Sequence, residues 1–424
     1  MNFNECMEFL NSYSKSGKPV KDLSRAENLM RIIGNPEKKL KFIHIAGTNG
    51  KGSTVEYISN ALIFSGYKTG QFTSPFVLHY TDRIRIDGTE IDEESLCEIC
   101  SFIRENIDSQ PYSQFEITMA IALLWYVQEK CDIVVLETGI GGLLDCTNVI
   151  PPPLLSVITS ISLDHTAILG STVEEIAVHK AGIIKENSAV IISRDNHQSV
   201  TDIIKNTASE KNAEFINCRN DYYEPLTRNG LNLGGLPFIY KGTEYKPAMS
   251  GVAQESNSIT AIEACKYLRK KGFDISDNNI KKSVETSQIK ARLQYIKGEP
   301  PVIVDGGHNL GGIMILSFQL RHCRYNGKKC YTVMGMVDSK DYDNGVRIIS
   351  CLSDKIFTVD DFAPNAVSAE KLAETAEKNT SAEPCKSLAE AVDKAKALAL
   401  ENDGIVVVCG SLYLASEYLN NTGK

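Results

Sequence analysis

Short apolar runs alternate with stretches of helical periodicity along most of the chain. The runs are rich in Val, Ile and Leu, and amphipathic spacing fills most intervals, for example Phe115–Gln128, Ser258–Lys270 and Leu388–Glu401. Buried strands that alternate with helices are typical of α/β architecture with largely parallel sheets. The predicted strands are Phe42–Ala46, Ile133–Glu137, Leu155–Ile161, Ala189–Ser193, Val302–Asp305, Tyr331–Met336, Ile356–Val359 and Ile405–Cys409.

Two segments interrupt this alternation. Cys218–Tyr245 is rich in Tyr, Gly and polar residues, which indicates a small antiparallel excursion. In Ile296–Pro301, glycine and paired prolines precede a fresh strand, which is typical of a domain boundary. Since 424 residues exceed one ordinary core, we expect two domains: a larger α/β domain over residues 1–296 and a smaller Rossmann-like domain over residues 297–424.

Composition narrows the functional classes. Hydrophobic residues make up 42% and charged residues 23% of the chain, and the net charge is −8. These values fit a globular protein and argue against nucleic acid as a partner. The first ten residues lack the pattern of a signal peptide, and no apolar run is long enough for a membrane span. We therefore expect a cytoplasmic protein without a membrane partner.

The twelve cysteines are scattered, which suits a reducing compartment better than a disulfide framework. Cys97 and Cys100 form one C-x-x-C pair. No second pair or His cluster accompanies them, so we interpret both as buried small hydrophobes rather than zinc ligands. The helix that contains them should turn Leu96, Ile99, Phe102 and Ile103 toward the core.

The most informative segment follows the first predicted strand. Gly47–Thr54 is a glycine-rich turn that opens a helix, and such a turn directs backbone N–H groups at a phosphate. Lys51 adds a mobile positive charge, and Ser53 adds a hydroxyl suited to Mg²⁺. The turn is shorter than a strict P-loop, and Gly52 stands where a hydroxyl residue is expected. The alternative is a plain strand–turn–helix corner.

Polar residues also end two other predicted strands. Glu137 follows an apolar strand and precedes glycines, which is where α/β proteins place ligand chemistry, although an incidental acid in a tight turn is the alternative. Asp164 and His165 end the next strand; without other context, such a histidine is more often a satisfied loop residue.

Four further residues have ordinary structural interpretations. Ser113 and Glu116 fit a capping box at a helix start. Lys180 fits a solvated helix lysine, and Asn257 fits a helix cap.

The segment Ile43–Thr54 resembles the nucleotide loop of the folylpolyglutamate synthase/dihydrofolate synthase family within the Mur ligase superfamily. Further matches run in order over nearly all of the chain, including Glu137–Gly142, Asp164–Thr166, Ile176–Lys185 and Asp305–Asn309. The resemblance implies an ATP-dependent ligase that adds L-glutamate to a reduced folate, to dihydropteroate or to both. The reaction would pass through an acyl phosphate and give ADP and phosphate. The resemblance makes residues 1–296 the ATP- and pterin-binding domain and residues 297–424 the glutamate-ligase domain of a monomer, with the active site in the cleft between them.

The resemblance also implies roles for individual residues. Two Mg²⁺ ions would be held by Ser74, Glu137 and His165, and Lys180 would be carbamylated. The catalytic residues would be Lys51, Lys180 and His308. The ATP-binding residues would be Thr48, Asn49, Gly50, Lys51, Gly52, Ser53, Asn257, Arg292 and Asp305, and the pterin or glutamate contacts would be Ser113, Phe115, Asp145, His308 and Ser411.

Three positions depart from the family pattern. Leu143 and Asn365 stand where arginine is expected, and Ala253 stands where histidine is expected. These departures motivate one alternative, a catalytically weak protein that binds ATP or folate. A second alternative is another Mur-type amino-acid ligase, which would share the nucleotide loop.

Overall fold

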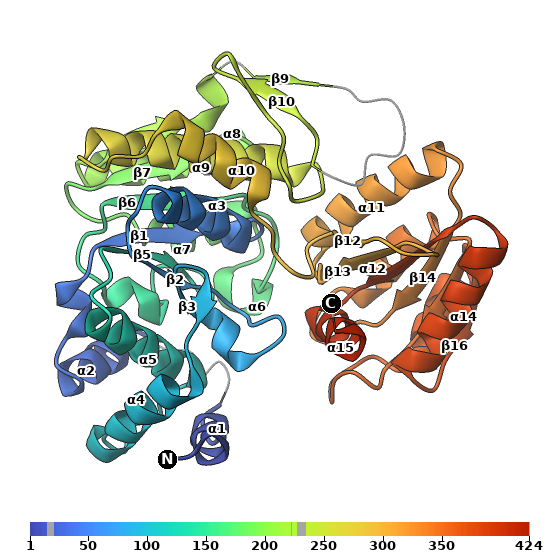
Figure 1. Cartoon of the computed structure of the whole chain (residues 1–424), viewed down its shortest axis with the longest axis horizontal. Helices are drawn as coiled ribbons and strands as arrows, with labels where there is room; N and C mark the ends of the chain where they lie inside the picture. Colours follow the sequence, from blue (N-terminus) through green and yellow to red (C-terminus); the bar gives the residue numbers. More distant parts are fainter. Residues whose placement is uncertain (15–20, 222, 227–234, 424) are drawn as a thin grey trace. The chain divides into compact units, whose positions relative to one another are not determined.

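The computed structural model describes residues 1–14, 21–221, 223–226 and 235–423 (Figure 1). The chain forms two compact units, one of residues 1–222 and 256–284 and the other of residues 223–255 and 285–424. This division falls after residue 284, whereas the boundary expected from the sequence falls after residue 296. The physical reason is that β12 (Gln294–Ile296) pairs antiparallel with β13 (Val302–Asp305), so the segment before the prolines belongs to the second unit's sheet.

An eight-stranded sheet organises the first unit, in the order β4-β3-β2-β5-β1-β6-β7-β8. The strands from β2 to β8 in this order run parallel, and only the edge strands β3 and β4 pair antiparallel. The mainly parallel α/β fold is thus confirmed. The strands are β1 (Phe42–Ala46), β2 (Thr69–Phe72), β3 (Ile84–Ile86), β4 (Thr89–Glu90), β5 (Ile133–Glu137), β6 (Leu155–Ile158), β7 (Ala189–Ile192) and β8 (Glu214–Asn217).

Helices cover this sheet, and α3 packs on the central strands β1, β2 and β5. Every residue of β1 and β5 is buried, as their continuous apolar sequences predict. The helices are α1 (Phe3–Asn11), α2 (Ser24–Ile32), α3 (Lys51–Phe64), α4 (Glu93–Asn106), α5 (Gln114–Gln128), α6 (Thr166–Leu169), α7 (Val173–Ala181), α8 (Gln198–Glu210), α9 (Ala253–Lys270) and α10 (Asp277–Thr286).

Helix α4 carries the C-x-x-C pair. Both cysteines are buried and free, and no group of three His, Cys, Asp or Glu side chains suited to a metal occurs among the described residues. The prediction for Phe102 is wrong, because its side chain is 43% exposed. Leu96, Ile99 and Ile103 lie within one helix face, and Phe102 lies at the edge of that face.

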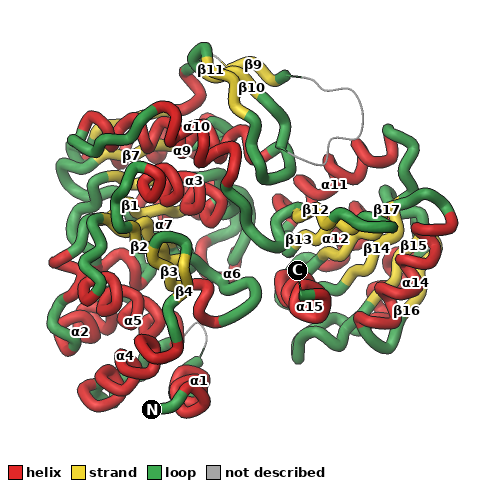
Figure 2. Tube along the Cα trace, in the orientation of Figure 1, coloured by secondary structure: helices red, strands yellow, loops and turns green. Residues whose placement is uncertain are grey.

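A six-stranded sheet, in the order β12-β13-β17-β14-β15-β16, organises the second unit. All its pairs are parallel except β12 with β13, and helices alternate with its strands in the Rossmann-like manner (Figure 2). The remaining elements of this sheet and its helices are β14 (Cys330–Met334), β15 (Lys355–Thr358), β16 (Ser381–Pro384), β17 (Ile405–Cys409), α11 (Leu310–Tyr325), α12 (Tyr342–Ser350), α13 (Ala369–Ala376), α14 (Leu388–Glu401) and α15 (Leu412–Thr422).

The predicted antiparallel excursion is confirmed in its described part. Strands β9 (Tyr223–Pro225), β10 (Phe238–Tyr240) and β11 (Thr243–Tyr245) form a three-stranded antiparallel sheet. Residues 222 and 227–234 of the excursion lie outside the described residues. In the described part of the chain, no helix combines the length and the hydropathy that crossing a membrane requires.

Candidate active site

The turn between β1 and α3 is held in place by the segment that follows β6. The backbone N–H of Thr48 donates to the carbonyl of Ser160 at 2.8 Å, and the Thr48 hydroxyl donates to the carbonyl of Ser162 at 3.0 Å. The hydroxyl of Thr159 donates to the carbonyl of Asn49 at 2.8 Å. These contacts end β6 at Ile158, three residues before the predicted end, because the backbone beyond it bonds the turn instead. The predicted phosphate-binding turn therefore has a fixed shape.

Gly50 is one of the residues on which this shape depends. Its φ of +87° lies in the left-handed region, and a Cβ there would lie 2.3 Å from Oδ1 of Asn257. Helix α9 starts at Ala253, so Asn257 lies inside the helix and the helix-cap interpretation is wrong. The structure instead places this predicted nucleotide contact against the turn.

We expect Gly50→Ala to raise the KM for ATP roughly tenfold, because the left-handed backbone costs about 1–2 kcal/mol with a Cβ and the turn must also move away from Asn257. Steady-state kinetics checks this, with Gly66→Ala as the matched control. Gly66 also has a positive φ, of +85°, but a Cβ there would meet nothing within 4 Å. Equal effects of the two substitutions on the KM for ATP would contradict the prediction.

Lys51 and Glu137 meet at the start of α3. Nζ of Lys51 lies 3.6 Å from Oε1 of Glu137, and their side chains are 14% and 4% exposed. The backbone N–H of Ser74 donates to Oε2 of Glu137 at 3.3 Å. The structure thus brings together three of the predicted site residues from three separate segments. It also gives Glu137 a specific partner, which an incidental turn acid would lack.

His165 follows β6 and precedes α6. Its side chain is 37% exposed, and its Nε2 lies 3.9 Å from Oδ1 of Asp164. Its role as a metal ligand stays a prediction.

Lys180 is buried, so its interpretation as a solvated helix lysine is wrong. Its side chain leaves α7 and its Nζ donates to the carbonyl of Gly47 at 2.7 Å. Burial, together with the charge of Lys51, lowers the pKa of Lys180 to about 7. A large fraction of this amine is therefore neutral near pH 7, directly beside the predicted phosphate-binding turn.

Phe115 and Asp145 lie side by side at Gly139. A Cβ on Gly139 would lie 2.6 Å from the Phe115 ring and 3.1 Å from Oδ2 of Asp145. The Asp145 carboxylate accepts from the backbone N–H groups of Ile140 and Thr147, at 2.7 and 3.1 Å, and from the Thr147 hydroxyl at 2.6 Å. Burial raises the pKa of Asp145, and these hydrogen bonds oppose that rise. An aromatic ring and an acceptor thus lie near the same glycine, as expected for a site that binds a flat heterocycle.

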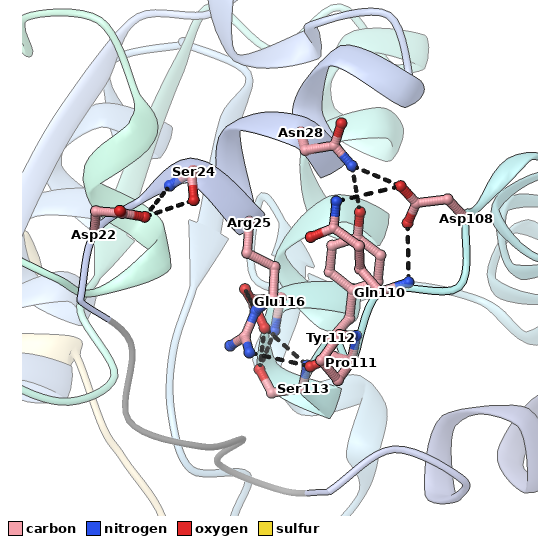
Figure 3. A network of polar contacts seen from close by, with 10 residues as sticks. All are labelled: Asp22, Ser24, Arg25, Asn28, Asp108, Gln110, Pro111, Tyr112, Ser113 and Glu116. Carbon is pink, nitrogen blue, oxygen red and sulfur yellow. Dashed lines mark hydrogen bonds and ion pairs between the residues drawn. The ribbon is translucent and has the colours of Figure 1, made fainter.

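Ser113 begins α5 in a complete capping box (Figure 3). Its hydroxyl donates to Oε2 of Glu116 at 2.8 Å, and Oε1 of Glu116 accepts from Nε of Arg25 at 2.8 Å. The capping interpretation is confirmed, and a pterin contact of Ser113 stays a prediction. The sequence analysis did not identify Arg25 as a partner of Glu116, because nothing in the segment around Arg25 indicates a contact with a residue so far along the chain.

In the second unit, Asp305 and Arg292 lie close together. The buried Asp305 carboxylate accepts from the backbone N–H groups of Leu293 and Gly307, each at 2.9 Å. Burial raises the pKa of Asp305, and the charge of Arg292 opposes that rise. The structure thus joins the two predicted nucleotide contacts of this unit in one local group.

His308 and Ser411 follow neighbouring parallel strands, β13 and β17, with Asp305 opposite Cys409. Nδ1 of the half-buried His308 lies 3.1 Å from the carbonyl of Gly306, which can only accept, so Nδ1 carries a proton. Ser411 is buried and caps α15 through a hydrogen bond from the N–H of Tyr413. The carboxyl ends of adjacent strands therefore place both predicted substrate contacts at one edge of the sheet.

The departures Leu143 and Asn365 have defined contacts. Leu143 is 43% exposed, and its N–H donates to the carbonyl of His179 at 2.7 Å. Asn365 donates from its side-chain amide to Asp338 at 3.1 Å, which joins two loops of the second unit. Asn365 thus has a structural role in place of the expected arginine.

Comparison with known proteins assigns the family. The Mur ligase middle domain matches residues 45–265, and the Mur ligase glutamate ligase domain matches residues 291–412. The dihydrofolate synthase/folylpolyglutamate synthase of Bacillus subtilis is 33% identical over 412 residues, 93% of each chain. The folylpolyglutamate synthase of Lacticaseibacillus casei is 31% identical over 355 residues, 81% of each chain. The solved structure of E. coli FolC in complex with DHPP and ADP is 27% identical, with a TM-score of 0.87, and the match covers 100% of this chain and 98% of that one. The chain therefore belongs to the folylpolyglutamate synthase/dihydrofolate synthase family of the Mur ligases.

Proposed function

We propose that this protein joins L-glutamate to a folate, and in addition to dihydropteroate if it is bifunctional, with conversion of ATP to ADP and phosphate. The observation that carries the proposal is the turn between β1 and α3, in which Lys51 lies beside Glu137 and the buried Lys180 bonds Gly47. Family membership over 93% of the chain supports the substrate class.

The reaction needs activation of a carboxylate, because the leaving group of a free carboxylate would be oxide. Transfer of the γ-phosphoryl group of ATP to a carboxylate oxygen releases ADP and forms an acyl phosphate. The glutamate amine then attacks the acyl carbon, the amide bond forms, the amine loses a proton, and phosphate leaves. Positioning and electrostatic stabilisation supply most of the catalysis in phosphoryl transfer.

The turn and its lysine would bind the transferred phosphate. Backbone N–H groups at the start of α3 are directed toward one point, and Lys51 would neutralise charge on the γ-phosphate. Arg292 would pair with phosphate oxygens, for which a planar guanidinium is suited. On this assignment, Asp305 would contact the nucleotide next to Arg292.

The donor set at Glu137 fits Mg²⁺, which prefers oxygen ligands. Glu137 is a buried carboxylate, and Ser74, whose backbone N–H bonds it, carries a hydroxyl. Glu137 and Ser74 would hold it, and His165 would hold a second ion. When bound, Mg²⁺ neutralises charge on the phosphates. A carbamate on Lys180 would add an anionic oxygen beside the turn, and the depressed pKa of Lys180 supports this modification because CO₂ reacts with the neutral amine.

The substrates would occupy two groups of residues. Phe115 would stack on the pterin ring and Asp145 would accept hydrogen bonds from it. His308 and Ser411 would position the incoming glutamate. That the protein is a monomer in the cytoplasm stays a prediction.

Release of ADP by the purified protein tests the function. MgATP and glutamate are supplied with dihydropteroate, with tetrahydrofolate or with no pterin. Release that requires both glutamate and a pterin supports the ligase, and the preferred pterin decides between one and two additions. Binding of ATP without pterin-dependent release would contradict the proposal and favour a different acceptor or a weak paralogue.

The substitution Leu143→Arg distinguishes the proposed ligase from a catalytically weak paralogue. Because Leu143 is an exposed residue whose backbone already bonds His179, we expect arginine there to change kcat by less than about threefold, as for most surface substitutions. The same ADP assay checks this. A strong rise from near-zero activity would favour the weak paralogue.

A further inference from the structure

His44 is a polar residue at the centre of an apolar strand. It lies in β1, opposite Leu136 of β5 and Ser156 of β6, and its side chain is fully buried. Its Nε2 lies 2.9 Å from Oγ1 of Thr147, whereas its Nδ1 is buried without a hydrogen-bond partner. An apolar side chain would avoid the cost of burying that nitrogen, so stability alone does not account for a histidine here.

The hydrogen bonds around Thr147 fix the protonation of His44. The single hydroxyl proton of Thr147 is donated to Oδ1 of Asp145 at 2.6 Å. Both oxygens of Asp145 are acceptors here, since Oδ1 also accepts from the backbone N–H of Thr147 and Oδ2 from that of Ile140. Oγ1 of Thr147 must therefore accept from His44, and Nε2 of His44 carries the proton. Burial lowers the pKa of His44 to about 3, so the ring stays neutral in this form at every pH where the protein would work.

These contacts form one chain from the central strand to the candidate substrate site. His44 donates to Thr147, Thr147 donates to Asp145, and Asp145 lies beside Gly139, which the Phe115 ring also approaches. Hydrogen bonds in series polarise one another and restrict the rotamers of their members. Thr147 thereby holds Asp145 in one orientation, and His44 holds the hydroxyl of Thr147.

We propose that His44 is a positioning residue for substrate binding, which acts through Thr147 to direct the Asp145 carboxylate toward the N–H donors of a pterin ring held against Phe115. This inference rests on the proposed function and names a residue of the same site that the sequence analysis did not single out. It predicts an effect on the pterin that is separate from any effect on ATP or glutamate.

Two substitutions at His44 test the proposal. His44→Leu removes the donor, whereas His44→Gln keeps an N–H near the position of Nε2. We expect His44→Leu to raise the KM for the pterin roughly five- to tenfold, which corresponds to the net free energy of one hydrogen bond. The KM values for ATP and glutamate should stay within about twofold of wild type. His44→Gln should recover most of that loss.

Thr147→Val removes the hydroxyl that joins His44 to Asp145, and it tests the same proposal in case His44→Leu does not fold. It should also raise the KM for the pterin selectively, and adding His44→Leu to it should raise that KM little further, since the link is already broken. Thr138→Val is the matched control, because the Thr138 hydroxyl is buried without a hydrogen-bond partner. The thermal midpoint of each variant shows whether it is folded.

The outcomes distinguish the positioning role of His44 from the proposed ligase function. A selective rise in the pterin KM that glutamine reverses supports the positioning role. Unchanged KM values in folded His44→Leu and Thr147→Val, or equal rises for all three substrates, would overturn it while the ligase function stands. A wild type that neither binds nor uses a pterin would overturn both.

Discussion

Lys51→Met is expected to lower kcat by about 10²–10³, the typical cost of removing one preorganised group that stabilises transition-state charge. Nζ of Lys51 stands at the start of α3 beside Glu137, at the turn proposed to bind the γ-phosphate. Methionine keeps the length of the side chain and removes its charge. The measurement is pterin-dependent ADP release under saturating MgATP, with the KM for ATP determined in parallel.

Two further variants make this result interpretable. Lys51→Arg keeps the charge but changes its shape, and it should retain more activity than Lys51→Met. Lys39→Met removes an exposed lysine of the same unit and should leave kcat unchanged. Because Lys51→Met also leaves the buried Glu137 without its cation, the thermal midpoint must be measured as well. A folded Lys51→Met variant with a kcat within threefold of wild type would contradict the role assigned to Lys51.

Lys180→Ala is the second substitution with a large expected effect. If a carbamate on Lys180 supplies an anionic oxygen beside the turn, its loss should lower kcat about 10²-fold or more, as for other electrostatic groups at a reacting phosphate. Acetate or formate at high concentration should restore part of the activity by placing a carboxylate in the vacated space. Alanine is the better substitution for this purpose, since arginine would fill the space with a permanent cation.

The carbamate itself has a direct readout. Incubation with ¹³C-bicarbonate should give a carbamate carbon signal in the wild type that is missing from Lys180→Ala. Since the pKa of Lys180 is about 7, its neutral form grows as pH rises through 7, and the signal should weaken as pH falls below that value. Lys185→Met is the matched control: Lys185 is another lysine of this segment with a pKa lowered by burial, and its Nζ bonds the carbonyl of Asn148. A wild type without the signal, or Lys180→Ala with full activity, would refute the modification.

The local part of the site could be predicted from the sequence. A buried strand followed by glycines and Lys51 specifies its own turn and helix, because every contact that defines these elements is close along the chain. The burial of Cys97 and Cys100 follows in the same way from helical spacing. Phe102 shows the limit, because periodicity tells which residues share a face but fixes the edges of that face poorly.

Contacts between distant segments could not be predicted in this way. The pattern around Lys180 fits a solvated helix, yet β1 and α7 bring its amine to Gly47, 133 positions away. Asn257 reads as a helix cap, but α9 places it against Gly50. The segment 223–255 joins the second unit although it precedes part of the first.

The sequence by itself determined the α/β class, the main strands, the phosphate-type turn and, through its motifs, the family resemblance. The tertiary structure decided which side chains meet: Lys51 with Glu137, Lys180 with the turn, and His44 with Asp145 through Thr147. The reason is physical. Backbone geometry and periodicity are local properties, whereas burial, pKa and hydrogen-bond partners depend on which faces of separate elements pack together.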